Sequence, residues 1–198
     1  MIVIYIRREE VNESFIIKWS PNKNGETYKA LSIIEESLKE KGIDSEWFWL
    51  GTKPVRGCIA CGSCSNTNRC VFNDDIANEL IEKIIECDGL IVGTPVYFSG
   101  ANGALTAVLD RVFYAAKTKV TLFNGKPAAT ITTMYRSGAN HAIDRINKYF
   151  LFNNMPVIPT SYWSLKFADN SSVENDEKGR LTMKNLGINM AEYLKNTH

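Results

Sequence analysis

Short apolar runs alternate with amphipathic segments along most of this 198-residue chain. The runs that predict strands are rich in β-branched and aromatic residues, and they lie at 14–19, 46–50, 89–93, 127–133 and 156–163. Between them, apolar residues recur at helical spacing, as Ala30, Leu31, Ile34 and Leu38 do before a closing Gly42. The helices predicted in this way span 27–41, 74–87, 105–112, 142–152 and 180–196.

Five strands that alternate with five helices indicate an α/β fold, in which a parallel sheet carries helices on both faces. Such sheets bind ligands beyond the carboxyl ends of their strands. The loops that begin at Ser20, Gly51, Thr94 and Thr133 all leave those ends. Residues 1–13 are interpreted as an N-terminal extension or an extra edge strand, and 165–178 as a polar surface excursion.

Composition narrows the class of protein. The chain is 44% apolar and 23% charged, with a formal net charge of +1, so neither nucleic acid nor a membrane is an expected partner. No apolar run is long enough to span a bilayer, and the N-terminus does not have the pattern of a signal peptide. We therefore expect one cytoplasmic domain over residues 1–198, with its cysteines reduced or bound to metal.

Four of the five cysteines, Cys58, Cys61, Cys64 and Cys70, fall within thirteen residues in a C-x2-C-x2-C-x5-C pattern. The spacing brings several sulfurs around one point, as an iron–sulfur cluster or a zinc ion requires. Three interpretations of loop 58–70 stay open: a 4Fe-4S cluster, a structural zinc, and an empty, reduced loop. The fifth, Cys87, lies on a predicted helix stripe and is expected in the core.

The loop 20–27 joins a strand to a helix N-terminus, where backbone N–H groups and the helix dipole can hold a phosphate. It lacks the lysine and glycine spacing of the commoner nucleotide loops, and a plain βα turn is the alternative. The loop 94–103 places Tyr97 and Phe98 among Pro and Gly residues, either as a wall for a planar ring or as ordinary loop packing. Flavin mononucleotide (FMN) fits a phosphate grip beside an aromatic wall.

These motifs resemble those of a known family. Ser20, Pro21, Asn24, Gly25 and Thr27 resemble the phosphate loop of the flavodoxin-like NADPH-dependent FMN reductases. The segment 94–98 with 105–111, and the segment 176–187, resemble two later motifs of that family. The cysteine loop is similar to that of the iron–sulfur flavoproteins, in which four cysteines hold a 4Fe-4S cluster near the FMN of a partner subunit. Glu26 departs from the pattern, since a small or amide residue is usual there.

The resemblance implies a flavodoxin-like three-layer sandwich with a five-stranded sheet of order 2-1-3-4-5. It implies an FMN-dependent oxidoreductase, in which the flavin carries the chemistry and the electron donor is NAD(P)H or a ferredoxin-like protein. Relatives are usually homodimers or homotetramers. The residues assigned to FMN are Ser20, Asn22, Asn24, Gly25, Thr27, Pro95, Val96, Tyr97, Phe98, Thr133, Tyr135, Ser137 and Gly138. Two other classes stay open: an electron carrier without substrate turnover, and a non-enzymatic metal-binding module.

Overall fold

The computed structural model describes residues 13–18, 20, 22–161, 165–167 and 172–197. Within these residues the strands are β1 (Glu13–Lys18), β2 (Asp44–Trp49), β3 (Gly89–Tyr97), β4 (Gly100–Ala101), β5 (Ala128–Met134) and β6 (Leu165–Phe167). The helices are α1 (Glu26–Glu40), α2 (Ala77–Glu86), α3 (Gly103–Thr118), α4 (Ala139–Phe152) and α5 (Glu177–Asn196). Two short 3-10 helices, η1 (Ser63–Asn66) and η2 (Val173–Asn175), complete the elements.

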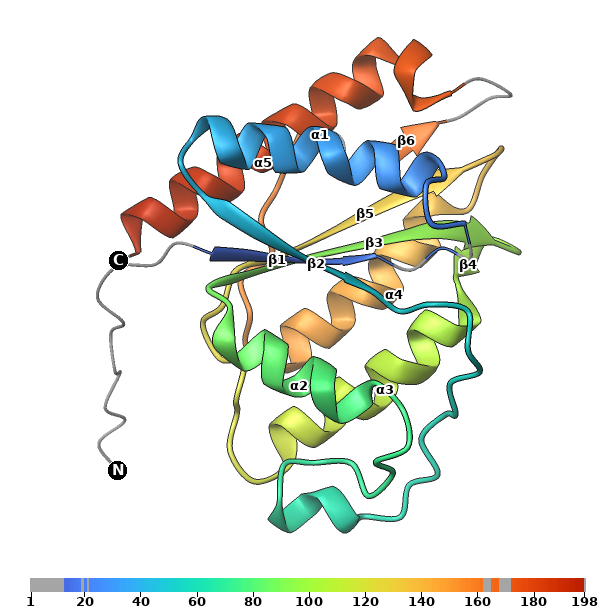
Figure 1. The fold of residues 1–198 in the computed structure, drawn as a ribbon, viewed down its shortest axis with the longest axis vertical. Helices are drawn as coiled ribbons and strands as arrows, with labels where there is room; N and C mark the ends of the chain where they lie inside the picture. The colour runs from blue at the N-terminus through green and yellow to red at the C-terminus, as the bar shows by residue number, and fades with distance from the viewer. Residues whose placement is uncertain (1–12, 19, 21, 162–164, 168–171, 198) are drawn as a thin grey trace.

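The strands pair in the order β2-β1-β3-β5-β6, and every neighbouring pair along this path is parallel. β4 lies off the path and pairs antiparallel with the end of β3. With β4 left aside, β5 and β6 are the fourth and fifth strands in chain order, so the predicted flavodoxin-like order 2-1-3-4-5 is confirmed. The carboxyl ends of the strands meet at the edge where β4 lies (Figure 1).

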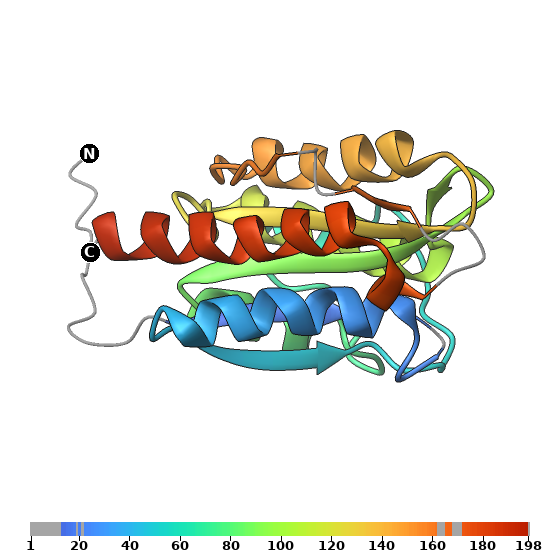
Figure 2. The ribbon, with the colours of Figure 1, turned by 90° about the horizontal axis from the view of Figure 1, so that it is seen from above.

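Helices cover both faces of the sheet. α1 and α5 lie side by side on one face, and α2, α3 and α4 lie on the other (Figures 1 and 2). Leu90 and Val92 of β3 are buried against the second group, whereas Ile91 between them is buried against the first. Successive side chains of a strand point to opposite faces, so a continuously apolar central strand supplies both layers of the core.

The end of α1 shows why the helical prediction succeeds there. Leu31, Ile34 and Leu38 are fully buried along one stripe. The Gly42 N–H donates to the Lys39 carbonyl and the Ile43 N–H to the Leu38 carbonyl, while Gly42 has a φ of +73°. This is the Schellman pattern, in which a glycine ends the helix and satisfies its last carbonyls.

The predicted fifth strand, 156–163, is wrong in its position. Val157 makes only an isolated bridge to Ala128, and the edge strand β6 begins at Leu165. Pro159 explains the break, because proline has no N–H to continue the ladder beyond Ile158. Positions 162–163 of the predicted strand lie outside the described residues.

Two further boundaries differ from the prediction. α2 begins at Ala77 rather than near Asn73 or Asp74, because the Asp75 carboxylate accepts the Ala77 N–H and pairs with Arg111 of α3. The segment 165–178, predicted as a surface excursion, contains β6, η2 and the first residues of α5. The predicted extension 1–13 lies outside the described residues except for Glu13.

Candidate functional site

The loop before α1 is ordered by its own polar groups. Asn22 Oδ1 accepts the Asn24 N–H at 3.2 Å, and the Asn22 carbonyl accepts the Gly25 N–H at 3.4 Å. Ser20 is buried, and its carbonyl accepts the indole N–H of Trp49 at 3.0 Å. Gly25 is the N-cap residue of α1 and provides no side-chain cap. With no side chain at its N-cap residue, the N-terminus of α1 can present backbone N–H groups to an anion.

Thr27 of α1 and Thr133 of β5 meet below this loop. Their hydroxyl oxygens are 2.7 Å apart, and both side chains are buried. The two residues are 106 positions apart in the sequence. The hydrogen bond therefore joins the predicted phosphate loop to the loop that follows β5.

The Glu26 carboxylate contacts η2 and Lys29. It accepts the Val173 N–H at the start of η2 and pairs with Lys29 at 3.2 Å. Lys29 also contacts Glu174 at 3.2 Å and donates to the Ser172 hydroxyl at 2.9 Å. The hydrogen bonds to Glu26 and then Glu174 raise the pKa of Lys29 above its ordinary value. Lys29 therefore balances the negative charge of the Glu26 carboxylate, which is also hydrogen-bonded to the start of η2.

The aromatic loop is a tight hairpin between β3 and β4. Val96 pairs with Ala101 and Tyr97 with Gly100, which leaves Phe98 and Ser99 as the two turn residues. Both turn residues have positive φ, +47° and +61°, a conformation that two-residue hairpins favour but that side chains other than Gly, Asn and Asp adopt at a cost. Tyr97 is half-exposed, and Phe98 is fully exposed, so ordinary loop packing does not account for the Phe98 ring.

The loop after β5 reaches this hairpin. A Cβ built on Gly138 would lie 2.3 Å from the Ser99 Cα, so the two loops are in direct contact. Tyr135 is exposed, with the Arg136 guanidinium 5.4 Å from its ring centre, and Ser137 is exposed beside them. The structure therefore brings the three groups of residues predicted to bind FMN to one edge of the sheet.

The four clustered cysteines lie elsewhere, in the connection from β2 to α2 that passes along α3 (Figure 1). Cys58 and Cys61 are exposed, Cys64 is buried and Cys70 is half-buried. All four line one pocket of about 20 Å³. Among the described residues, however, no group of three His, Cys, Asp or Glu side chains is placed to hold a single metal ion.

The second half of the cysteine loop is held firmly. The Thr118 hydroxyl donates to the Cys64 carbonyl at 2.8 Å, and the Asn68 amide donates to the Ala115 carbonyl at 2.7 Å. Asn78 of α2 accepts the Cys70 N–H at 2.8 Å and donates to the Cys70 carbonyl at 2.9 Å. Cys64 is therefore held by α3 and Cys70 by α2, whereas Cys58 and Cys61 lie in the exposed first part of the loop.

The thiols differ in electrostatic environment as well. The Ser63 hydroxyl and N–H lower the pKa of the exposed Cys61 thiol. Burial raises the pKa of the Cys64 thiol. In the metal-free chain, Cys61 is therefore the readier thiolate and Cys64 the more inert thiol.

Arg111 contacts the cysteine loop, although the sequence pattern did not single it out. It was predicted only as part of a helix motif, yet its side chain is buried and its Nε donates to Cys70 Sγ at 3.2 Å. Asp75, predicted as a helix-start residue, is its counter-ion. A basic residue on the apolar stripe of α3 was the available signal, since an arginine is rarely buried without a partner. Cys87, the C-cap residue of α2, is buried in the core as predicted.

Comparison with known proteins identifies the family. A family model described as NADPH-dependent FMN reductase matches residues 15–170. The chain belongs to this family. Two relatives named iron-sulfur flavoprotein, both from Methanocaldococcus jannaschii, are 29% and 30% identical to it. These alignments cover 90% and 91% of this chain and 95% and 96% of the relatives.

Solved structures of low identity support the same fold. A structure titled flavone reductase superposes with a TM-score of 0.72 at 16% identity, covering 93% of this chain and 64% of that one. An archaeal flavodoxin superposes with a TM-score of 0.62 at 14% identity, covering 92% of this chain and 99% of that one.

Membership of the NADPH-dependent FMN reductase family makes the chain a flavoprotein oxidoreductase of the FMN type. The described part of the chain contains no helix long and apolar enough to cross a membrane.

FMN fits the residues at the sheet edge. The N-terminus of α1 has no side-chain cap, the Thr27 and Thr133 hydroxyls lie next to it, and the half-exposed Tyr97 ring lies at the end of the neighbouring strand β3. These are the donors and the apolar surface that a phosphate-tailed planar ring needs. The four cysteines of the loop line one small pocket, and cysteine thiolates are the ligands that iron–sulfur clusters use.

Proposed function

We propose that this chain is an FMN-dependent oxidoreductase that binds its flavin across the carboxyl ends of β1, β3 and β5. The observation that carries the proposal is the 2.7 Å contact between the Thr27 and Thr133 hydroxyls, which brings the phosphate loop and the loop after β5 together. FMN, when bound, accepts a hydride or single electrons and passes them on singly or as a pair.

The chain's own residues would bind and orient the group. The N–H groups at the start of α1 and the Thr27 hydroxyl would hold the phosphate. Tyr97 would lie along the ring, and the backbone around Gly138, fixed by its contact with Ser99, would face the polar edge. Gly25, Asn24, Asn22 and Ser20 would shape the phosphate loop. Pro95, Val96, Tyr135 and Ser137 would line the ring's surroundings, and Phe98, being fully exposed, would close over it from outside.

The cysteine loop would hold a 4Fe-4S cluster through Cys58, Cys61, Cys64 and Cys70. The four cysteines line one pocket, although they are not placed to share a single ion. A cluster is several atoms across and takes ligands that lie further apart than those of one zinc ion. The two relatives named iron-sulfur flavoprotein support the same assignment.

The electron donor separates two versions of this function. In the first, NAD(P)H delivers a hydride to the flavin, and an acceptor such as a quinone or free flavin is reduced. In the second, a ferredoxin-like protein supplies single electrons, and the chain acts as a carrier without substrate turnover. The gathered cysteines favour the second version, because a cluster transfers one electron at a time.

The test is an anaerobic preparation of the full chain. Its absorbance spectrum and its flavin, iron and sulfide content are measured first, and its oligomeric state by light scattering. Reduction of the flavin by NADPH, NADH and reduced ferredoxin is then followed separately. Flavin reduced by a pyridine nucleotide supports the first version, and flavin reduced by ferredoxin alone supports the second. A colourless protein that binds no added FMN contradicts both and leaves a metal-binding module.

A further inference from the structure

The Arg111 guanidinium uses all five of its N–H groups on the cysteine loop and its flanks. Nε donates to Cys70 Sγ at 3.2 Å. Nη1 donates to the Arg56 carbonyl at 3.2 Å and to Asp75 Oδ2. Nη2 donates to Asp75 Oδ1 at 2.9 Å and to the Phe72 carbonyl at 3.4 Å. An arginine has five donors in a fixed fork, so this one is fully satisfied.

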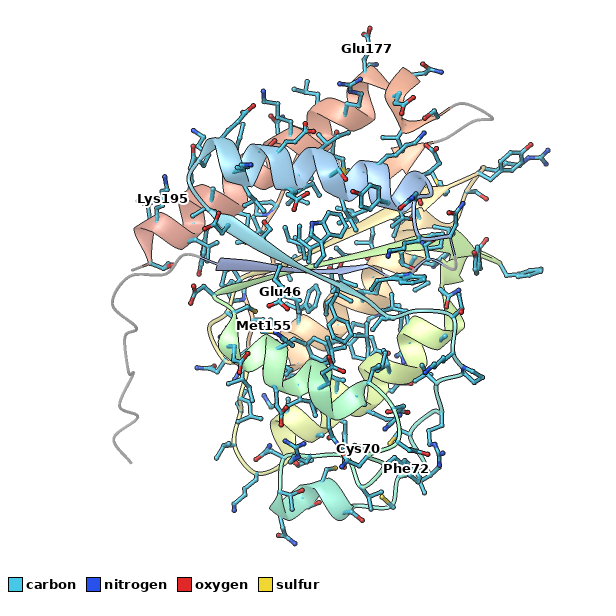
Figure 3. The ribbon with its side chains drawn as sticks, in the orientation of Figure 1. Glu46, Cys70, Phe72, Met155, Glu177 and Lys195 are labelled. Atoms are coloured by element: carbon cyan, nitrogen blue, oxygen red, sulfur yellow. The ribbon has the colours of Figure 1, made fainter. Side chains whose placement is uncertain are left out.

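The acceptors lie on both sides of the cysteine motif. Arg56 precedes Cys58 by two residues, and Phe72 follows Cys70 by two residues. One side chain from α3 therefore joins the point where the loop enters the site to the point where it leaves. The Phe72 ring adds to this closure, since the guanidinium carbons of Arg56 and Arg111 lie 4.4 and 5.5 Å from its centre. Cys70 and Phe72 lie in the loop outside α2 and α3 (Figure 3).

A purely structural ion pair would not need the Nε contact. The pairing of Arg111 with Asp75 already neutralises the buried cation, whose side chain is 1% exposed. The remaining donor at Nε nevertheless points at the sulfur of one of the four clustered cysteines. Sulfur that accepts an N–H bond is stabilised as a thiolate, and such bonds around a thiolate site orient the ligand and raise its reduction potential.

We propose that Arg111 is the positioning residue of the cysteine site: it fixes the Cys70 sulfur by an N–H···S bond and clamps the two ends of loop 58–70 together. This inference rests on the proposed metal-binding role of the loop. In this proposal, Arg111 and Asn78 hold Cys70 in position before the metal group binds. The exposed Cys58 and Cys61 then close on the bound group.

The experiment must separate this role from simple support of the fold. Removing Arg111 alone leaves the Asp75 carboxylate buried without its partner, which destabilises proteins strongly. The test therefore uses the double variant R111M/D75N, which removes the pair together, beside D75N, which retains the donor to Cys70. R111K is the additional variant, because it keeps a positive charge near Asp75 but cannot span both ends of the loop. R145M is the matched control, since Arg145 also pairs with a carboxylate, Asp110, on the surface.

The first measurement is anaerobic titration of the metal-free full chain with Co²⁺, followed by the thiolate-to-cobalt charge-transfer absorbance. We expect R111M/D75N and R111K to bind Co²⁺ at least about tenfold more weakly than the wild type. D75N and R145M are expected to stay within about threefold of it. Circular dichroism and thermal unfolding of the metal-free variants show which of them are folded.

The second measurement is the reduction potential of the reconstituted iron–sulfur centre, which a change in fold stability alone does not move. A lower potential in R111K and in R111M/D75N, with unchanged flavin content, supports the proposal. Folded variants with wild-type Co²⁺ affinity, spectrum and potential overturn it and leave Arg111 as a structural residue. A wild-type chain that binds FMN but neither Co²⁺ nor iron overturns the inference and the cluster proposal together, while the flavin assignment stands.

Discussion

Gly138 and Ser99 touch across the loops that follow β5 and β3, and a Cβ on Gly138 would overlap the Ser99 Cα at 2.3 Å. The obstacle is backbone, which cannot swing aside as the end of a long side chain can. Gly138 also has a φ of +92°, where side chains are strained. The two loops are therefore packed against each other through their backbones, beside the proposed flavin site.

Replacement of Gly138 by alanine should lower both the stability of the chain and its affinity for FMN. We expect the G138A variant to lose about 2 kcal/mol of unfolding free energy and to bind FMN at least about tenfold more weakly, because one loop must shift. Thermal denaturation and quenching of FMN fluorescence measure the two effects. Gly125 is the matched control, since its φ of +80° carries the same backbone cost but no atom lies within 4 Å of the added Cβ. Equal FMN affinity in G138A and G125A would contradict the proposed position of the flavin.

Loss of the Thr27 hydroxyl should weaken binding of the FMN phosphate more than binding of the flavin ring. We expect the T27V variant to bind FMN about three- to tenfold more weakly, as the loss of one hydrogen bond implies, and riboflavin with nearly unchanged affinity. Titrations of both flavins measure the difference. T106V serves as the control, because the Thr106 hydroxyl donates to the Gly103 carbonyl within α3 itself. A T27V variant that weakens both flavins equally would place the phosphate elsewhere.

The Asp75–Arg111 pair predicts a pH dependence of stability. Burial tends to raise the pKa of the Asp75 carboxyl, but the hydrogen bonds from Arg111 and the Ala77 N–H outweigh it, so the pKa lies below its ordinary value. A carboxyl group with a depressed folded pKa contributes stability that is complete above its unfolded value, about 3.9, and is lost as the pH falls through the folded value.

We therefore expect D75N to lose about 3 kcal/mol of unfolding free energy at neutral pH, as the breaking of a buried ion pair does. The difference from the wild type should be constant from about pH 5 to 7 and should shrink below about pH 4. Urea denaturation of the metal-free proteins across this range measures it. A difference that grows on acidification would show that Asp75 is not ionised in the folded chain.

The cysteines should react in a defined order. In the metal-free chain we expect iodoacetamide to modify Cys61 first, because it is exposed and its pKa is lowered by Ser63, and Cys64 last of the four clustered cysteines, because it is buried. Mass spectrometry of peptides from timed samples gives the order. The S63A variant should slow the reaction at Cys61 several-fold and leave that at Cys58 unchanged. Rapid labelling of Cys64 would show that loop 58–70 is open throughout.

Local patterns predicted the layers of this fold but not all of its edges. The stripe of Leu31, Ile34 and Leu38 with its closing Gly42 is a signal contained within one helix, and the structure matches it. The edge strand was misplaced, because its pairing with β5 depends on distant residues and on the missing N–H of Pro159.

The candidate sites also combine residues that a local pattern indicates with contacts between residues far apart in the sequence. Thr27 and Thr133 could be assigned together because parallel strands carry their carboxyl ends to one edge. The contact of Arg111 with Cys70 spans 41 positions, and that with Arg56 spans 55, so no local spacing indicates it. Asp75 was interpreted from its place before a helix, whereas its burial against α3 decides its role.

Helix α3 separates the two candidate redox centres within one chain. Gly103, its first residue, follows the aromatic hairpin directly, while Tyr114, eleven positions later, lines the cysteine pocket. At the rise of an α-helix, these positions are about 17 Å apart along the axis. If both centres bind as proposed, the exposed side chains beside the cysteines, Ile59, Val71 and Tyr114, would form the surface at which a second molecule approaches the cysteine loop.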